Sequence, residues 1–152
     1  MIRITRDPLD AAALLQDFSR DRLDTGAVVS FTGLTRGRTG DRAVHALTLE
    51  AYPGFTERVM EEIEADARAR FDIQDALAVH RWGTIDVGEP VIFVAVAAAH
   101  RRPAFEAADF LMDHFKIRAP FWKREDGPDG RRWIEPRDQD HADLARWAEE
   151  TP

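Results

Sequence analysis

The sequence predicts a single α+β domain in which helices flank a largely antiparallel sheet. The chain has 152 residues, which is enough for one hydrophobic core. Runs typical of strands are mixed with helical patterns, and several strands follow one another directly. A doubly wound parallel sheet would place a helix after each strand, so this order favours α+β. Because no internal repeat or linker interrupts residues 1–152, we expect one domain.

The first elements are a short strand, a helix and a second strand. Residues Ile2–Thr5 alternate as a strand does. Asp7 and Pro8 predict the start of a helix, with aspartate as N-cap and proline at the first helical position. Apolar residues from Leu9 to Phe18 then recur at helical spacing, and the β-rich run Ala27–Thr32 predicts a buried strand.

The middle of the chain combines three strands with one long helix. Residues Val44–Tyr52 alternate as a strand. Between Phe55 and Phe71, apolar residues mark one face of a helix whose other face carries glutamate and arginine. Residues Leu77–Trp82 and Val91–Ala99 predict two more strands, joined by a segment with two glycines.

The last third predicts a helix, a hairpin and a final helix. Pro120 forbids a smooth continuation of the first of these helices. Residues 121–125 and 131–135 flank a turn typical of a hairpin, and residues 138–150 form an amphipathic pattern. Pro103 opens the first helix, and its expected inward residues are Phe105, Ala108, Met112 and Phe115.

Composition excludes several classes of function. The absence of cysteine excludes disulfides, thiolate nucleophiles and cysteine-ligated metals. A net charge of −7 argues against non-specific nucleic-acid binding. The longest apolar run, Val91–Ala99, is too short to span a membrane, and the polar start lacks a signal peptide, so we expect a cytoplasmic protein. The five histidines lack metal-ligand spacing, and His80 on its alternating strand is expected to be structural.

Positive charge is nevertheless dense in a few places, which predicts a site for a small anion. The loop from Gly33 to Arg42 combines glycines with arginines, which can bind anions through paired N–H groups. His100 and Arg101 precede an expected helix N-terminus, where phosphate binds readily. A solvated hairpin loop and a capped helix with solvated arginines explain the same residues, so both interpretations stay open.

Lys116 and Lys123 are the only lysines, against nineteen arginines. Lysine changes its pKa on burial and can release a proton near neutral pH, which arginine cannot. We expect Lys116 to end a helix and Lys123 to lie on the strand beyond. Phe121 and Trp122 could then form an apolar wall that lowers the pKa of the lysines. The alternative, in which both aromatic side chains are core and Lys123 belongs to a charged edge, stays open.

Taken together, these segments resemble the large, catalytic subunit of molybdopterin synthase over about residues 26 to 148. The resemblance implies an α/β hammerhead-type fold and a sulfurtransferase that converts cyclic pyranopterin monophosphate (precursor Z) into molybdopterin. It also implies a partner, a small ubiquitin-like subunit that carries sulfur as a C-terminal glycine thiocarboxylate, and a dimer of large subunits within a heterotetramer. The stretches that carry it are Gly26–Gly33 with Arg36, Leu47–Gly54, Ala99–Arg101, Phe105–Ala107 and Lys116–Glu125, followed by Trp133 and Glu135.

The same resemblance implies site residues. Lys116 matches a general acid/base, with direct attack by its amine as the alternative, and Lys123 matches a group that orients the thiocarboxylate and stabilises negative charge. Arg137 matches a basic residue that reaches the site from the other protomer. Neither a metal nor another cofactor is implied. The substrate-binding positions are Leu34, Thr35, Arg36, His100, Arg101, Arg124, Glu125 and Arg137.

One position departs from the family pattern. Leu34 stands where relatives often carry a basic residue, so a side-chain contact is lost there and only a backbone contact survives. The neighbouring Arg38 is placed to compensate for the missing basic side chain.

Two other functions also fit the residues: a non-catalytic module that docks a ubiquitin-like C-terminal tail, and a regulator that binds an anionic metabolite without turnover.

Overall fold

The computed structural model describes residues 1–148, which build two four-stranded sheets, a short hairpin and four α-helices. The first sheet has the order β1 (Ile2–Thr5), β6 (Asp75–Arg81), β8 (Pro90–Ala98) and β2 (Ala27–Leu34). The second has the order β10 (Gly130–Ile134), β9 (Trp122–Gly127), β5 (Ala46–Glu50) and β7 (Gly83–Asp86). The hairpin is β3 (Arg38–Thr39) with β4 (Arg42–Ala43), and the helices are α1 (Ala11–Ser19), α2 (Phe55–Arg70), α3 (Arg101–Arg118) and α4 (Asp138–Ala145), followed by the 3₁₀ turn η1 (Arg146–Ala148).

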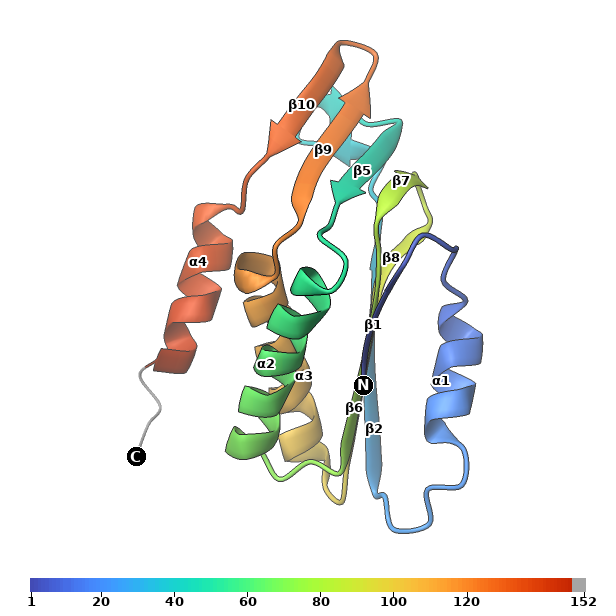
Figure 1. The fold of residues 1–152 in the computed structure, drawn as a ribbon, viewed down its shortest axis with the longest axis vertical. Coiled ribbons are helices and arrows are strands. Elements are labelled where there is room, and N and C mark those ends of the chain that lie inside the picture. Colours follow the sequence, from blue (N-terminus) through green and yellow to red (C-terminus); the bar gives the residue numbers. More distant parts are fainter. Residues whose placement is uncertain (149–152) are drawn as a thin grey trace.

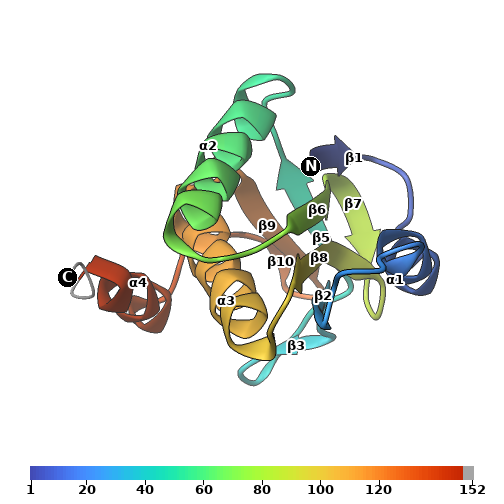
Figure 2. The ribbon, with the colours of Figure 1, turned by 90° about the horizontal axis from the view of Figure 1, so that it is seen from below.

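Helices cover both faces of the first sheet. Figure 1 and Figure 2 show α1 on one face and α2 with α3 on the other, with α4 outside α3. This arrangement explains why β8 is apolar along its length rather than alternating. Val94 and Val96 pack towards α2 and α3, whereas Phe93 and Ala95 pack towards α1. Strand β8 therefore lies at the centre of the core.

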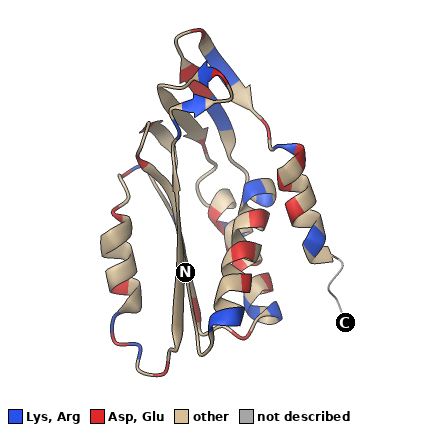
Figure 3. Cartoon of the chain, turned by 180° about the vertical axis from the view of Figure 1, so that it is seen from behind, with Lys and Arg blue, Asp and Glu red and all other residues tan. Residues whose placement is uncertain are grey.

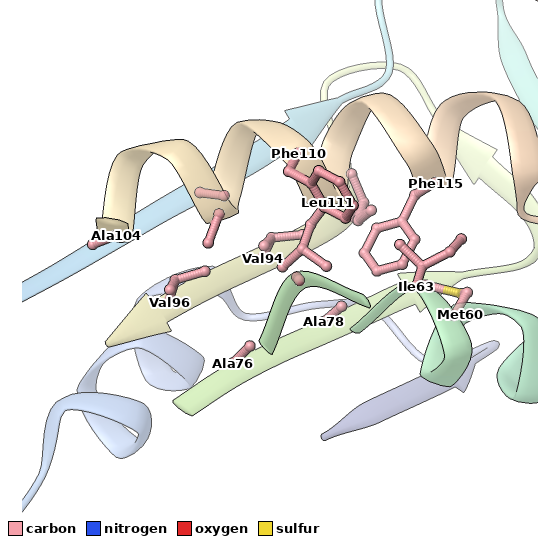
Figure 4. Packing of buried hydrophobic residues seen from close by; sticks show 14 of the residues in the cluster. Met60, Ile63, Ala76, Ala78, Val94, Val96, Ala104, Phe110, Leu111 and Phe115 are labelled. Atoms are coloured by element: carbon pink, nitrogen blue, oxygen red, sulfur yellow. The ribbon is translucent and has the colours of Figure 1, made fainter. Parts of the chain in front are cut away.

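The main core lies between α2, α3 and the first sheet. Small side chains on α3, such as Ala104 and Ala107, allow the helix to lie close to the strands. Further along the helix, Phe110, Leu111 and Phe115 fill the space towards Ile63 of α2 (Figure 4). Since α3 is fixed along its length, the position of its C-terminal end is fixed too.

The second sheet has one packed face and one open face. Leu47 and Leu49 of β5 are buried with Ile85 of β7 on the packed face. Trp122 and Trp133 lie on the open face, where each is more than half exposed. The alternation along β9 and β10 thus separates an inner from an outer set of side chains.

The α+β class and the dominance of antiparallel pairing are confirmed, since β1 with β6 is the only parallel pair in residues 1–148. The strands form two sheets rather than one, and β7 was not expected. The helix start at Asp7 and Pro8 was wrong: the N–H of Asp7 donates to Thr5 Oγ1 (3.0 Å), and Asp10 caps α1 by accepting from Ala13 N–H (3.0 Å). The segment between Thr5 and Asp10 is therefore a bend.

Two aromatic residues expected inside are exposed. Phe105 is 59% exposed because α3 turns its alanines, not this ring, towards the sheet. Trp122 lies on the open face of the second sheet and Lys123 on the packed face, so of the two aromatic residues only Phe121 lies on the same side as Lys123.

The final helix ends at Ala145 and continues as η1 to Ala148, while the last part of the expected segment 138–150 lies outside the described residues. No helix among residues 1–148 is long and apolar enough to cross a membrane.

Candidate active site

The two lysines lie on neighbouring elements joined by a short connection. Lys116 is in the last turn of α3 and is exposed. The helix ends at Arg118 because Pro120 disfavours helical backbone at the residue before it. Lys123 is the second residue of β9 and lies opposite Leu49 of β5, on the packed side of the second sheet. The site thus lies where the C-terminal end of α3 meets the second sheet.

Electrostatic interactions link Lys123 with Lys116 and Arg36. Burial lowers the pKa of Lys123, and the positive charges of Lys116 and Arg36 lower it further. The carboxylates of Glu125 and Asp140 act in the opposite direction. Four charged groups, from α3, the loop after β2, β9 and α4, therefore act on the Lys123 amine, and with the amine itself three of these five charges are positive.

His80, which the sequence marks as structural, lies beneath this cluster, a place that the sequence did not predict. Its ring stacks on Phe121, with ring centroids 4.0 Å apart, and its Nδ1 is 2.8 Å from the carbonyl oxygen of Arg81. Burial lowers the pKa of His80 to about 4, and the nearby charge of Lys116 contributes. The imidazole is therefore neutral at neutral pH. The only sequence signal was its place at the end of β6, next to a buried arginine.

The loop after β2 is fixed at its start. The N–H of Thr35 donates to the carbonyl of Glu89 (3.0 Å), and its own carbonyl accepts from the N–H of Gly88 (2.8 Å). The hydroxyl of Thr35 is buried and has no hydrogen-bond partner within residues 1–148. Leu34 and Arg36, on either side, are exposed. Of the three predicted residues here, Arg36 is the one brought next to Lys123.

Arg124 and Glu125 point to opposite faces of the second sheet. Arg124 shares the open face with Thr48 and Asp126, and its Nε donates to Asp126 Oδ1 (3.0 Å). Its guanidinium also lies 5.8 Å from the ring centre of Trp133. Glu125 is buried on the packed face, the same face as Lys123. The structure therefore brings Glu125, but not Arg124, to the lysine cluster.

Arg137 lies near the cluster within its own chain. It is the N-cap of α4 and holds Asp140 by three hydrogen bonds, one from its backbone N–H (2.8 Å) and two from its guanidinium (3.1 and 3.5 Å). Burial alone would raise the pKa of Asp140, but these hydrogen bonds and the charge of Lys116 lower it. Asp140 thus interacts with Arg137 and with the charge of Lys116, so Arg137 is linked to the site within its own chain.

His100 and Arg101 are far from the lysines in one chain. His100 is the N-cap of α3, and Lys116 follows it by sixteen residues, which is about 24 Å along the helix at 1.5 Å per residue. Both residues are exposed at the end of the first sheet. Figure 3 shows basic residues on the β9–β10 hairpin and near the C-terminal end of α3, and a separate basic region at the far end of the helices, where α3 begins.

The sequence and the structure of the chain match one family of known proteins. The family described as MoaE protein matches residues 4–118. The chain belongs to the MoaE family. Its relatives extend the match beyond Arg118: the molybdopterin synthase catalytic subunit of Caulobacter vibrioides is 51% identical over 150 residues, covering 99% of both chains. The catalytic subunit of Escherichia coli is 47% identical over 127 residues, covering 84% of this chain and 85% of its own.

A solved MoaE structure shares the same fold. The molybdopterin biosynthesis MoaE protein from Burkholderia ambifaria superposes with a TM-score of 0.82 at 40% identity and covers 99% of both chains. The MoaE family resemblance inferred from the sequence is confirmed by these matches. They extend over the segment with both lysines, since the Caulobacter relative aligns over nearly the full chain.

Proposed function

We propose that this chain is the catalytic subunit of a molybdopterin synthase, an enzyme that transfers sulfur to precursor Z. The observation that carries the proposal is the convergence of Lys116, Lys123 and Arg36, in a chain whose relatives bear that name over nearly its full length. Two amines provide for proton transfer, and an arginine provides for an anion. The absence of cysteine means that sulfur must arrive already activated on another molecule.

The sulfur donor in this proposal is a thiocarboxylate at the C-terminus of a small ubiquitin-like partner subunit. Lys116 acts as general acid/base during attack by the sulfur and breakdown of the acyl intermediate. Lys123 orients the thiocarboxylate and stabilises negative charge. Its lowered pKa also lets Lys123 release a proton at lower pH than an ordinary lysine, so both amines can take part in proton transfer.

The phosphate of the pterin binds Arg36, whereas the N–H and carbonyl of Thr35 are already hydrogen-bonded to Glu89 and Gly88. Binding by Leu34 and Thr35 stays a prediction. His100 and Arg101 belong to the same anion site only if a second copy supplies them, because about 24 Å of helix separates His100 from Lys116 in one chain. The proposed homodimer provides this. The two copies together with two partner subunits form the proposed heterotetramer.

The free edge of β2 supports a dimer of this kind. Strand β2 lies at the edge of the first sheet and exposes Phe31 (44%) and Leu34 (56%), and a long apolar edge is a ready template for pairing with another chain. Antiparallel pairing of two β2 edges reverses the second copy end for end. The second copy's His100, which follows β8 beside Ala27, would then lie near Leu34 and Arg36 of the first.

The test is a reconstitution of the reaction. Purified chain is mixed with precursor Z and a thiocarboxylated partner, and formation of the dithiolene is measured. Lys116→Ala separates the enzyme from the docking module: an enzyme loses sulfur transfer and still binds the partner, whereas a docking module keeps its whole function. A metabolite-binding regulator would return precursor Z unchanged. The roles of Arg124 and Arg137 in substrate binding, and the cytoplasmic location, stay predictions.

A further inference from the structure

The loop that carries Arg36 is fastened to the β9–β10 hairpin through its side chains. The hydroxyl of Thr39 donates to Glu125 Oε1 (2.7 Å). Arg42 Nε donates to Asp129 Oδ1 (3.0 Å), and its Nη2 donates to the carbonyl of Gly130 (2.8 Å). Arg42 Nη1 also lies 3.6 Å from Glu125 Oε2. Both strands of the β3–β4 hairpin are therefore tied to the second sheet.

The charges in this contact are buried. The side chain of Glu125 is 7% exposed and that of Arg42 is 14% exposed. Glu125 Oε2 and Arg42 Nη1 form an ion pair without a hydrogen bond, and neither atom has another partner within residues 1–148. Removing one partner of a buried pair leaves the other charge uncompensated, which is costly. The carboxylate of Glu125 is thus committed to Thr39 and Arg42 and is closed off from a ligand.

Backbone contacts fix the far end of the same loop. The N–H of Val44 donates to the carbonyl of Gly37 (2.9 Å), and the N–H of His45 donates to the carbonyl of Asp126 (2.7 Å). At Gly127 a Cβ atom would lie 2.5 Å from the carbonyl oxygen of Ala43, so only glycine lets these two backbone segments approach so closely. Arg36 lies between this fixed end and the fixed backbone of Thr35.

We propose that Thr39, Arg42 and Glu125 form a buried clamp that holds Arg36 beside Lys123, and that Glu125 is a positioning residue rather than a ligand of the substrate. Glu125 lies two residues from Lys123 on the same face of β9, so one carboxylate holds the loop and faces the amine. The inference rests on the proposed function for its kinetic consequence and on the contacts above for its structural one.

Thr39→Val removes one hydrogen bond and leaves every charge of the clamp in place. The clamp predicts that this variant raises the KM for precursor Z roughly five- to tenfold, while kcat changes much less. It also predicts faster hydrogen exchange of the Val44 and His45 amides, measured by NMR. Glu125→Gln and Arg42→Gln give the same two effects, and the Thr39→Val/Glu125→Gln double variant is less impaired than the product of the single effects.

The matched control is Thr5→Val. Thr5 also makes a side-chain hydrogen bond, accepting from the N–H of Asp7 (3.0 Å), but it lies on β1, at the edge of the first sheet opposite to β2. This variant keeps wild-type KM and wild-type exchange at Val44 and His45. The clamp is overturned if Thr39→Val leaves both the exchange and the KM unchanged, or if only Glu125→Gln raises KM, as a direct ligand would.

The two readouts separate this inference from the proposed function. If the wild-type chain forms no dithiolene, the function fails, yet exchange at Val44 and His45 still tests the clamp. If wild type is active and the exchange does not respond to Thr39→Val, the clamp fails and the function stands. Thermal unfolding of each variant shows that it is folded, and Thr39→Val provides the test if the charge variants do not fold.

Discussion

The two sheets of this protein are held by different forces. The first sheet, with α1, α2 and α3, is apolar on both faces, and β8 is buried from Ile92 to Ala98. The second sheet has a smaller apolar cluster on one face and an open face on the other, and ion pairs and hydrogen bonds attach the β3–β4 hairpin to it. Each part provides one of the two lysines, Lys116 from α3 and Lys123 from β9. Stability and reactive geometry are therefore separable, and substitutions can test this.

The largest effect is expected at Lys123, in the polar part. Lys123→Ala is expected to slow dithiolene formation about 10²–10³-fold, the usual contribution of a group that stabilises developing negative charge, with little change in stability. The measurement is single-turnover kinetics alongside thermal unfolding. Lys123→Arg keeps the charge but cannot release a proton, so it is also expected to be slow. A wild-type rate for Lys123→Arg would mean that charge alone is required.

The same lysines offer an independent check on their proximity. Because the chain contains only two, an NMR spectrum of labelled lysine side chains has two amine signals. The positive charge of Lys116 lowers the pKa of Lys123, so Lys116→Ala is expected to raise it. An unchanged titration of Lys123 in this variant would show that the amines do not converge.

Trp147 gives the largest expected effect on stability, in the apolar part. Its ring packs edge-on against Phe71 and Phe110, and its Nε1 donates to Asp113 (2.7 Å). Trp147→Ala is expected to lower the free energy of unfolding by about 3–5 kcal/mol. Chemical denaturation measures this. A loss below about 1 kcal/mol would contradict the packing described for α4.

His80 joins the two parts and makes stability depend on pH. Its pKa is lowered to about 4 by burial, whereas the unfolded chain has an ordinary value near 6.5, so the unfolded state binds the proton more readily. Stability is therefore full above about pH 6.5 and falls as the pH decreases towards 4, by up to about 3 kcal/mol. His114, whose pKa is also lowered by burial, acts with the same sign.

The carboxylates whose pKa is lowered lose their contribution mainly below this window, so the range from 6.5 to 4 reports on the histidines. His80→Phe preserves a ring to stack on Phe121 and is expected to remove most of the pH slope, measured by denaturation at a series of pH values. The same substitution at the exposed His141 is the control. An unchanged slope in His80→Phe would place the proton uptake elsewhere.

The smallest change in the free energy of unfolding is expected at Trp133, the exposed counterpart of Trp147. It is 53% exposed on the open face and meets Trp122 edge-on, with ring centroids 6.5 Å apart. Trp133→Ala is expected to cost about 0.5–1.5 kcal/mol, the value of an aromatic pair. Denaturation under the conditions used for Trp147→Ala compares the two tryptophans. Equal losses at both positions would contradict the division into an apolar and a polar part.

The sequence predicted the apolar part better than the polar part. The spacing of apolar residues predicted β1, β8 and α2, because a buried face repeats along a strand or helix. The sequence also placed Lys116 on a helix and Lys123 on a strand. It did not predict that Trp122 and Lys123 face opposite ways, that β7 exists, or that Phe105 is exposed. These depend on which neighbour covers each face, which a single strand or helix does not record.

Within the site, local pattern singled out the residues but not their distances. Arg36, Lys116 and Lys123 come from three elements, and only the fold brings them together. His100 and Arg101 were grouped with them, yet the length of α3 separates them. His80 was expected to be structural, but its place beneath Phe121 was not predicted, because it arises from a contact between residues 41 positions apart.

The connection from Ala119 to Phe121 sets a requirement on length as strict as any on residue type. The carbonyl of Pro120 accepts a hydrogen bond from Thr56 Oγ1 (3.3 Å), and Phe121 is stacked on His80. These contacts fix the position of the connection, so its length cannot change without breaking them. Inserting or deleting one residue before Trp122 would shift β9 by one position and turn its lysine to the open face, because strand side chains alternate. Such a change in length would separate the amines while leaving both lysines in the sequence.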